Sequence, residues 1–456
     1  MKKLFGTDGM RGEAGKFPLD AATVEIVGAS LANHLQEKLS RAPLIVIGRD
    51  TRESGPWLEQ AFARGVTEAG GDLKSGDVIT TPGVAYLARV LSADAGVVIS
   101  ASHNPYQDNG LKIFAAQGSK LDEATERLIE KDIFSQTQNQ RATAVNGSDA
   151  LPASLNSVEA QSLQSRYLDF LADEIGRGLS LSGIKLVVDG ANGAASALAP
   201  ALLKRLGAEV IAINNTPDGR NINLNCGSLH TEQLQSEVLK QHADLGVAFD
   251  GDADRSLFVD AQGQLVNGDG ILWVLANYLS ARGELKQQIV VATVMSNVGL
   301  ELALKSRGLS LVRTDVGDKY VLEELLRSGA TLGGEQSGHI ILPKLSLAGD
   351  GLITMLCVLR VIADEQKSLQ QLAEGFQVFP QILINVKVAQ KLAFAEVPSI
   401  TEASREIENE LGSRGRLLLR YSGTEPLARV MLEGESQPQI EKFARRLAGV
   451  IEQTLG

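Results

Sequence analysis

Short hydrophobic runs alternate with helical stretches three times along the first three quarters of the chain. We predict strands at 44–50, 77–82 and 96–99, at 185–190, 209–213 and 245–249, and at 288–293, 309–313 and 330–333. Helices are predicted from about residue 57, near 200–206 and near 300–307. Short apolar strands that alternate with helices indicate βαβ units and mixed or parallel sheets.

A polar loop follows the last predicted strand of each set. These are the serine loop (100–105), the acidic loop (250–255) and the glutamate loop (334–339). Because α/β proteins place reactive groups at the ends of their strands, polar loops at corresponding strand ends indicate related domains around one cleft. Ordinary connecting loops remain the alternative.

The last quarter of the chain follows a different pattern. Strand-like runs at 381–388, 416–419 and 428–432 precede a helix at 438–453, which favours a small α+β module. A stretch rich in Gln, Asn, Ser and Thr at 133–162 reads as a linker. We therefore predict an α/β protein with three related α/β domains with mixed sheets, plus a smaller C-terminal α+β domain, around one central cleft. The predicted domains are 1–152, 153–256, 257–372 and 373–456.

Composition narrows the class of protein. The 456 residues are 44% hydrophobic and 22% charged, which suits a soluble globular chain. The longest apolar stretch, 352–363, is shorter than the roughly 18 residues of a membrane helix and predicts a buried helix instead. The N-terminus has no signal-peptide pattern, so we expect a cytoplasmic location and no membrane partner.

Charge and cysteine usage exclude further classes. The net charge of −11, with no long basic run, argues against nucleic acid as a partner. The two cysteines, Cys226 and Cys357, form neither a disulfide framework nor a CxxC zinc pair. An acidic protein that binds phosphate must concentrate positive charge locally, inside loops rich in Gly and Ser.

The acidic loop carries Asp250, Asp252 and Asp254, whose spacing along an extended loop puts three carboxylates on one side. Such a group can hold a hard divalent cation. An EF-hand is excluded, because Arg255 and Ala261 stand where its loop has Gly and Glu, and the haloacid dehalogenase pattern also fits poorly. Three carboxylates and a serine oxygen favour magnesium over calcium, while a solvated acidic turn remains the alternative.

Ser102 is the predicted nucleophile. His103 is its neighbour in sequence, where side chains usually diverge, so we expect no Ser-His-Asp arrangement. A phosphorylated serine fits better, because its oxygens would complete the metal site and store a transferable group. Lys112 could donate to that phosphoryl group or shuttle a proton, although a surface amine is the alternative.

The segment 420–426 has the composition of a phosphate-binding loop, and we call it the arginine loop. It combines an arginine, two hydroxyl groups and a glycine, with a second arginine shortly after; the candidate residues are Arg420, Ser422, Gly423, Thr424 and Arg429. A helix cap at Thr424 is the alternative. Neither a Walker A loop nor a G-x-G-x-x-G fingerprint is present. Serine, metal and phosphate cradle together indicate phosphoryl transfer.

Two further segments carry candidate residues. Glu335 and Ser337 can hydrogen-bond the vicinal hydroxyls of a sugar, and His339 is a candidate acid/base or a loop-orienting residue. At the N-terminus, the Gly-rich segment 5–12 places Arg11 where it could meet an anion, although a frayed terminus is the alternative.

These motifs together resemble the α-D-phosphohexomutase superfamily over essentially the whole chain. The resemblance rests on F-G-T-D-G-M-R-G at 5–12, S-A-S-H-N-P at 100–105, N-G-L-K at 109–112, D-G-D-A-D-R at 250–255, G-E-Q-S-G-H at 334–339 and S-G-T-E-P at 422–426. Gln336, the opening segment and the residues at 225–228 most resemble the bacterial branch that acts on glucosamine phosphates.

The resemblance implies an active phosphoserine at Ser102 and one Mg²⁺ held by the phosphoserine and the three aspartates. It implies that Glu335 and Ser337 recognise sugar hydroxyls, and that the arginine loop binds the phosphate that does not react. The implied activity interconverts glucosamine 6-phosphate and glucosamine 1-phosphate through a bisphosphorylated sugar, and feeds amino-sugar nucleotide synthesis for cell-wall precursors.

Roles for the remaining residues follow from that mechanism. Arg255 would offset charge on the transferring group, while His103, Lys112, Arg11 and His339 are candidates for proton transfer or charge stabilisation. A hexosamine 1,6-bisphosphate is the expected activator, and a homodimer is compatible with the resemblance. A mutase acting on mannose or glucose phosphates, a metal-dependent sugar phosphatase and a non-catalytic sugar-phosphate sensor remain alternatives.

Overall fold

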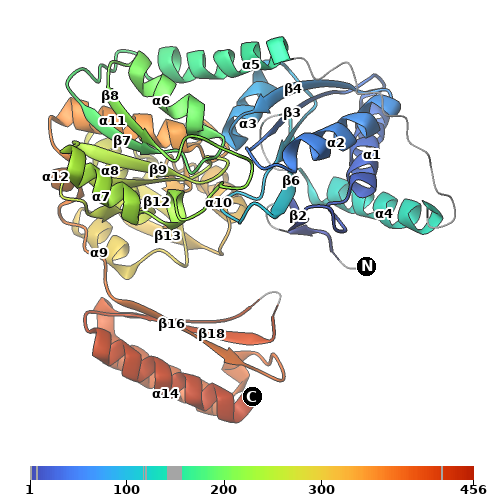
Figure 1. Ribbon diagram of the computed structural model, residues 1–456. Coiled ribbons are helices and arrows are strands. Elements are labelled where there is room, and N and C mark those ends of the chain that lie inside the picture. Colours follow the sequence, from blue (N-terminus) through green and yellow to red (C-terminus); the bar gives the residue numbers. More distant parts are fainter. Residues whose placement is uncertain (1–2, 7–8, 117, 119–120, 141–156, 423–424) are drawn as a thin grey trace.

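The computed structural model describes residues 3–6, 9–116, 118, 121–140, 157–422 and 425–456. Three α/β domains lie together in the upper part of Figure 1, and the fourth domain forms a separate lobe below them. The predicted fold class is therefore confirmed. Among the described helices, none combines the length and the apolar character that crossing a bilayer requires.

The first domain is built on a six-stranded mixed sheet. Its elements are β1 (Phe5–Gly6), β2 (Gly9–Glu13), α1 (Ala21–Leu39), β3 (Leu44–Arg49), α2 (Gly55–Glu68), β4 (Asp72–Val78), α3 (Thr81–Val90), β5 (Ala95–Ile99), β6 (Asp108–Ala115) and α4 (Glu123–Gln140). The strand order is β1-β2-β6-β5-β3-β4. β3 is parallel to β4 and β5, whereas β6 runs antiparallel to β5.

The second domain has a five-stranded sheet with the same plan. Its elements are α5 (Ser157–Asp169), a π-helical turn at Phe170–Ile175, β7 (Lys185–Asp189), α6 (Ala195–Arg205), β8 (Glu209–Ile213), a 3₁₀ turn at Gly227–Leu229, α7 (Glu232–Gln241), β9 (Leu245–Phe249), β10 (Ser256–Asp260) and β11 (Leu265–Val266). The order is β11-β10-β9-β7-β8, with β7 parallel to β8 and β9 and β10 antiparallel to β9.

The third domain has a four-stranded sheet in the order β13-β12-β14-β15. Its elements are α8 (Gly268–Ala281), a 3₁₀ turn at Lys286–Gln288, β12 (Ile289–Thr293), α9 (Val298–Ser306), β13 (Ser310–Thr314), α10 (Asp318–Ser328), β14 (Gly333–Gly334), β15 (Ile340–Ile341), α11 (Gly351–Glu365) and α12 (Leu369–Ala373). β12 is parallel to β13 and β14, and β15 is antiparallel to β14.

All three domains therefore end their parallel run in the same way. The last parallel strand (β5, β9 or β14) is followed by a loop and then by an antiparallel strand (β6, β10 or β15). The three connecting loops contain the serine loop, the acidic loop and the glutamate loop. Equivalent places in three related sheets thus carry the three predicted functional loops.

The fourth domain packs two helices against a three-stranded antiparallel sheet in the order β16-β18-β17. Its elements are β16 (Gln381–Lys387), a 3₁₀ turn at Phe394–Glu396, α13 (Pro398–Leu411), a 3₁₀ turn at Gly412–Arg414, β17 (Arg416–Tyr421), β18 (Leu427–Glu433) and α14 (Gln437–Leu455). Apolar residues at helical spacing on α14, including Ile440, Phe443 and Leu447, are buried against this sheet.

The hydrophobic cores separate the fourth domain from the others. One continuous cluster joins the first three domains and includes Val84, Tyr167, Val188, Leu272 and Leu356. Among the described residues, the core of the fourth domain is formed by a separate cluster, whose buried members lie between Val386 and Leu455. Since burial of apolar surface is the main stabilising contribution to folding, the first three domains are tied into one unit to which the fourth is attached.

Several predicted elements are displaced in the structure. The strand predicted at 77–82 is wrong at its end, because β4 stops at Val78 and α3 begins at Thr81. Thr80 caps that helix by accepting the Gly83 N–H, and Pro82 suits its first turn. The predicted strand at 330–333 begins only at Gly333.

The predicted linker and one boundary also differ in detail. α4 runs to Gln140 and α5 begins at Ser157, so helices occupy both ends of the stretch at 133–162. Residues 141–156 lie outside the described residues. The second sheet extends past the predicted boundary at 256, to Val266. The exact domain limits stay a prediction.

Candidate active site

The backbone of the serine loop is held in an uncommon conformation. Ser102 has a φ of 53°, a left-handed value that a residue with a side chain adopts at an energetic cost. Its carbonyl oxygen accepts hydrogen bonds from Arg52 Nη2 (2.9 Å) and Asn223 Nδ2 (2.8 Å). Its N–H donates to Ser100 Oγ, which in turn donates to Asp50. These contacts fix the position of Ser102, a residue that is 1% exposed.

The Ser102 hydroxyl points at the acidic loop of the second domain. Its Oγ donates to Asp250 Oδ2 over 2.5 Å. His103 Nδ1 lies 3.3 Å from the same Oγ, so the expectation that these two side chains diverge is wrong. His103 is nevertheless no triad base in this arrangement, because its Nδ1 accepts a hydrogen bond from Arg255 Nη1 (3.0 Å).

The electrostatic environment keeps His103 neutral at pH 7. Burial first, and then the guanidinium groups of Arg255 and Arg11, lower the pKa of His103 to about 4. A neutral imidazole whose Nδ1 accepts a bond carries its proton on Nε2. His103 can therefore donate one hydrogen bond from Nε2 without adding charge to the site.

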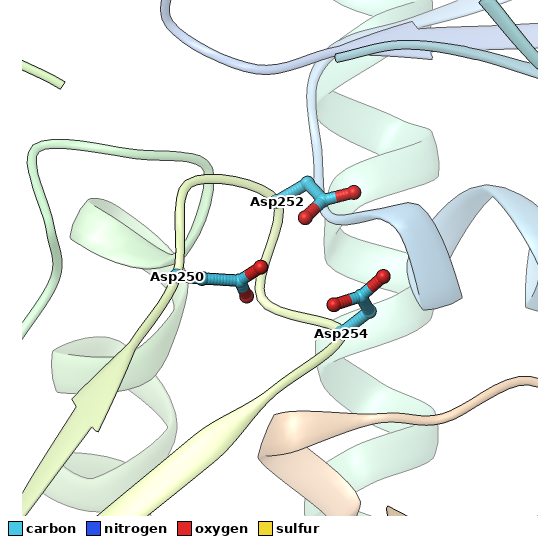
Figure 2. Close-up of side chains that lie close together, drawn as sticks. All are labelled: Asp250, Asp252 and Asp254. Atoms are coloured by element: carbon cyan, nitrogen blue, oxygen red, sulfur yellow. The ribbon is translucent and has the colours of Figure 1, made fainter. Parts of the chain in front are cut away.

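The three aspartates of the acidic loop converge, as predicted. One oxygen from each of Asp250, Asp252 and Asp254 lies within 4.8 Å of the others, and Figure 2 shows the three carboxylates facing one another. The loop is a tight turn rather than an extended segment, because Ala253 has a φ of 56° and its N–H donates to the carbonyl oxygen of Asp250. Curvature of the turn, and not alternation along a strand, brings the carboxylates together.

This cluster fits a divalent cation. The oxygen Oδ1 of Asp252 is buried and has no hydrogen-bond partner among the described residues. Burial, and then the charges of Asp254 and Asp252, raise the pKa of Asp250 well above its usual value. Buried carboxylates that repel one another are stabilised by a bound hard cation. The residues that would hold it are the three aspartates and Ser102.

Lys112 is buried in the same cluster. It lies on β6, is 3% exposed, and its Nζ contacts Asp252 Oδ2 (2.7 Å) and Asp254 Oδ2 (3.0 Å). The alternative that Lys112 is a surface amine is therefore wrong. A fixed ammonium group from the first domain thus offsets part of the negative charge of the second.

Two helices from other domains hold the acidic loop. At the start of α3, Thr81 donates to Asp252 twice, from its N–H to the main-chain oxygen (3.0 Å) and from Oγ1 to Oδ2 (2.5 Å). At the start of α11, the N–H of Gly351 donates to the carbonyl oxygen of Ala253 (3.0 Å). Helix N-termini favour nearby negative charge. All three α/β domains therefore position the metal ligands.

The start of α11 is itself fixed by a buried pair. Asp350 accepts hydrogen bonds from the N–H groups of Leu352 and Ile353, and its Oδ2 accepts the hydroxyl of Tyr167 (2.7 Å). Burial raises the pKa of Asp350 to about 6. The sequence did not predict that Thr81, Asp350, Arg52 and Asn223 support the site. Only Thr81 lies in a recognisable pattern, the Thr-Thr-Pro sequence that favours the start of a helix at α3.

A cavity of about 390 Å³ opens beside this cluster. Its walls come from the first three domains and include Leu4, Gly6, Gly9, Arg11, Asp254, Arg255, Val316, Gly317, Asp318, Glu335 and His339. Five of the predicted site residues thus share one cavity. The volume is in the range of small-molecule sites.

The glutamate loop forms one wall of the cavity. Glu335 Oε1 accepts a hydrogen bond from the N–H of Gly317, and its Oε2 accepts one from the hydroxyl of Ser337. Each distance is 3.2 Å. His339 is 4% exposed, and its Nε2 lies 3.9 Å from Asp318 Oδ2. A Cβ added at Gly349 would come within 2.3 Å of that ring nitrogen, so only glycine leaves room for the imidazole.

The arginine loop lies apart from the cavity. Arg420 and Arg429 face each other across β17 and β18, and Arg429 Nη2 lies 3.4 Å from Ser422 Oγ. Burial, and then the charge of Arg429, lower the pKa of Arg420. Gly423 and Thr424 lie outside the described residues. Among the described residues, the fourth domain contributes nothing to the cavity wall.

Comparison with known proteins identifies the class of this fold and site. Four models of phosphoglucomutase/phosphomannomutase match in order: α/β/α domain I at residues 2–140, domain II at 165–263, domain III at 267–379 and the C-terminal domain at 383–450. The chain therefore belongs to the phosphoglucomutase/phosphomannomutase family, the α-D-phosphohexomutases, and is an enzyme of that class.

Full-length relatives carry a more specific name. The phosphoglucosamine mutase of Solibacter usitatus is 46% identical over 458 residues, covering 100% of this chain and 99% of the relative. That of Caldicellulosiruptor saccharolyticus is 47% identical and covers 100% of both chains.

Solved structures share the fold at lower identity. A phosphoglucomutase/phosphomannomutase family protein from Burkholderia thailandensis has a TM-score of 0.79 at 24% identity, covering 100% of this chain and 99% of that one. The N-acetylphosphoglucosamine mutase of Aspergillus fumigatus, solved with GlcNAc-6P and magnesium, has a TM-score of 0.68 at 20% identity, covering 99% and 96%.

Proposed function

We propose that this enzyme is a phosphoglucosamine mutase, which interconverts glucosamine 6-phosphate and glucosamine 1-phosphate through a phosphorylated Ser102. The observation that carries the proposal is the contact of the Ser102 hydroxyl with Asp250, in the acidic cluster whose Asp254 lines the cavity. Full-length relatives of that name support the choice of substrate.

The proposed reaction has two phosphoryl transfers. The 1-hydroxyl of glucosamine 6-phosphate attacks the phosphorus on Ser102, the bond from phosphorus to Oγ breaks, and a 1,6-bisphosphate forms. After the sugar has turned over, Oγ attacks the 6-phosphate, the bond from phosphorus to O6 breaks, and glucosamine 1-phosphate leaves. A hexosamine 1,6-bisphosphate is the expected activator, because it can phosphorylate a free Ser102.

Charge must be balanced at the transferring group, which carries negative charge on its three equatorial oxygens. Magnesium bound by Ser102, Asp250, Asp252 and Asp254 would act there as a Lewis acid. Arg255 and Lys112 add fixed positive charge beside the same group. Burial lowers the pKa of Arg255, but the charges of Asp254, Asp250 and Glu335 outweigh burial and raise this pKa overall.

Proton transfer needs a group that faces the sugar hydroxyl. His339 and Arg11 line the cavity, and Lys112 lies within the acidic cluster. His103 is neutral and donates at most one hydrogen bond, from Nε2. We therefore assign His103 to orientation of the phosphoryl group and keep His339, Lys112 and Arg11 as the candidates for acid/base chemistry.

The remaining parts of the site bind the substrate. Glu335 and Ser337 are proposed to bind sugar hydroxyls, since Glu335 lines the cavity and accepts the hydroxyl of Ser337. Arg420, Ser422, Gly423, Thr424 and Arg429 are proposed to hold whichever phosphate is not reacting. Because the sugar must reverse between the two transfers, a binding loop for a generic dianion suits both orientations. A cytoplasmic location and a homodimer remain predictions.

A phosphomannomutase or phosphoglucomutase activity is the second candidate, since the family models and the Burkholderia thailandensis structure carry those names. Rates on the 6-phosphates of glucosamine, glucose and mannose separate the two. A kcat/KM for glucosamine 6-phosphate below that for either hexose would overturn the preferred assignment.

The role of Ser102 is tested with Ser102→Ala, followed by ³¹P NMR of the sugar phosphates. We expect a loss of turnover on the order of 10³-fold or more while calorimetry still detects sugar-phosphate binding. Wild-type turnover in this variant would refute the serine mechanism. In the wild-type protein, release of inorganic phosphate at the rate of substrate loss would indicate a phosphatase instead, and binding without isomerised product would indicate a sensor.

A further inference from the structure

We infer that Asn297 and Glu433 are positioning residues, which set where the fourth domain, and with it the arginine loop, stands relative to the cavity. The inference rests on the proposed function, in which the arginine loop holds the phosphate that is not reacting. Among the described residues, those that line the cavity include neither Asn297 nor Glu433, so both act through other groups.

One short loop of the third domain carries the hydrogen bonds to the fourth. This junction loop (295–298) follows β12 and ends at the first residue of α9, and Figure 1 shows α9 on the side of the upper domains that faces the fourth. Among the described residues, every hydrogen bond between residues 381–456 and the first three domains ends on this loop. Since the hydrophobic cores are separate, these directional bonds hold the fourth domain at its angle.

Glu433 ends β18 and contacts the start of α9. It is fully buried, and its Oε2 accepts the Val298 N–H (3.1 Å). The same oxygen accepts a hydrogen bond from Arg416 Nε (2.9 Å), and Oε1 accepts one from Gln381 Nε2 (2.9 Å). A helix N-terminus and a guanidinium group both favour a carboxylate, which offsets the cost of burying its charge. Glu433 therefore holds the end of β18 against α9.

Asn297 fastens the linker between the third and fourth domains (374–380) to the same loop. Its Oδ1 accepts the Phe379 N–H (2.9 Å), and its Nδ2 donates to the Phe379 carbonyl oxygen (3.0 Å). Oδ1 also accepts the Gly299 N–H (2.9 Å), which caps α9. A Cβ added at Gly299 would lie 1.8 Å from the carbonyl oxygen of Gln377, so the linker passes directly over the start of the helix. Asn297 therefore fixes the segment that leads into β16.

The junction loop is tied to the wall of the cavity through α8. The Asn297 N–H donates to Asp269 Oδ2 (2.8 Å), and Asp269 is the second residue of α8. The preceding residue, Gly268, donates its N–H to the carbonyl oxygen of Gln336 in the glutamate loop (3.0 Å). The first turn of one helix thus holds both the loop that meets the fourth domain and a loop that lines the cavity.

Two strands connect the junction to the arginine loop. Arg416 pairs with Glu433 at one end of β17 and β18, and Arg420 pairs with Arg429 four residues further along the ladder. Because side chains alternate along a strand, residues four apart lie on the same face, about 13 Å apart at the usual rise per residue. A rotation at the Glu433 end is therefore carried to the phosphate-binding arginines.

The test measures the kinetics of Glu433→Gln and Asn297→Ser on glucosamine 6-phosphate. In either orientation a glutamine amide turns its NH2 group towards a donor of the network, while serine can cap α9 but is too short to reach Phe379. We expect KM to rise about tenfold in each, with kcat and magnesium affinity nearly unchanged, because the acidic loop belongs to the second domain. Glu435→Gln is the matched control and should leave KM unchanged, since this exposed carboxylate pairs with Arg414 inside the fourth domain.

A double mutant shows whether Glu433 acts through the arginine loop. Adding Glu433→Gln to Arg429→Ala should raise KM only about threefold further, because one of the groups that Glu433 positions is already gone. A full tenfold rise on top of Arg429→Ala would overturn the inference. A fall in kcat at unchanged KM in Glu433→Gln, or a rise in KM in Glu435→Gln, would overturn it as well.

Small-angle X-ray scattering separates this inference from the proposed function, because it needs no substrate. Ligand-free Glu433→Gln should have a larger radius of gyration than wild type and Glu435→Gln, since its fourth domain is held less firmly. If wild type does not turn over glucosamine 6-phosphate, the proposed function fails and scattering alone decides; equal curves then overturn the positioning role. If wild type is active, an unchanged KM in Glu433→Gln overturns only that role. If Glu433→Gln does not fold, Asn297→Ser decides by the same criteria.

Discussion

The serine and acidic loops differ from the arginine loop in how firmly the rest of the molecule holds them. Ser102 and Asp252 receive bonds from residues of other loops and another domain, including Arg52, Asn223 and Thr81. The arginine loop lies on a domain with its own core, and none of its described residues lines the cavity. The reacting groups are therefore preorganised by several domains, whereas the distant phosphate would be bound by a domain with a separate core.

The difference between firmly held serine and acidic loops and a separate arginine loop suits a sugar that must turn over between the two phosphoryl transfers. The transferring phosphoryl group needs fixed charges within hydrogen-bond distance, because small displacements reduce phosphoryl transfer strongly. The other phosphate must be held at either end of the sugar. A fourth domain that closes over the cavity would hold it and exclude water, so that the phosphoserine is transferred rather than hydrolysed.

The largest expected effect comes from the serine and acidic loops, which the other domains hold in place. Asp250→Asn removes a carboxylate that accepts the Ser102 hydroxyl and would hold the metal. We expect kcat to fall on the order of 10³-fold and magnesium affinity, measured by calorimetry, to fall in parallel. Glu232→Gln, an exposed carboxylate on α7 of the same domain, is the control. Full activity in Asp250→Asn would remove the acidic loop from the mechanism.

The arginine loop should respond differently. Arg429→Ala removes one of the two guanidinium groups that face each other across β17 and β18. We expect KM for the sugar phosphate to rise about 30-fold with a much smaller change in kcat, because a charge-assisted phosphate contact is lost. Arg446→Ala is the control. Arg446 lies on α14 and pairs with Glu406, so its loss should change neither KM nor kcat. A fall in kcat with unchanged KM would contradict the division between the two regions.

The buried pair that supports the acidic loop gives a pH dependence. The pKa of Asp350 is about 6 in the folded protein against 3.8 for the free carboxyl, so the folded state retains the proton over that interval. Its contribution to stability is therefore full below pH 4 and is lost as the pH rises through 6. Relative to Asp350→Asn, which keeps the cap, the wild-type free energy of unfolding should fall by about 2–3 kcal/mol between pH 4 and 7. Denaturant titrations of both proteins test this; equal pH profiles would show that Asp350 does not titrate as described.

Much of the fold could be predicted because the chain's apolar strands are fully buried. Runs such as Leu245–Phe249 have no polar member, so they stand out in the sequence. The antiparallel strand β6 was missed for the opposite reason. It carries Asp108, Asn109 and Lys112, whose polar side chains disrupt the hydrophobic pattern, and Lys112 contacts the acidic cluster.

The site was predicted where its residues form local motifs. Ser102 and the three aspartates are brought together as expected, but the tight turn and the contact with His103 follow from tertiary packing. Residues that position the site from another domain leave almost no local signal. Thr81 is separated from Asp252 by 171 positions, and it reads locally as the start of a helix.

The smallest expected effect tests how the acidic loop is held. Thr81 contacts Asp252, a proposed metal ligand, without being a ligand itself. Thr81→Val keeps the shape and the N–H bond to Asp252 but removes the bond from Oγ1 to Oδ2. We expect magnesium affinity to fall about tenfold, with a similar loss of kcat at low magnesium that saturating metal restores. Thr81→Ser keeps the hydroxyl and should behave as wild type. Thr81→Val could instead lower kcat at saturating magnesium while magnesium affinity is unchanged. That result would show that the hydroxyl orients the reacting groups and not the cation. It would also show that the acidic loop keeps its position without the Thr81 hydroxyl.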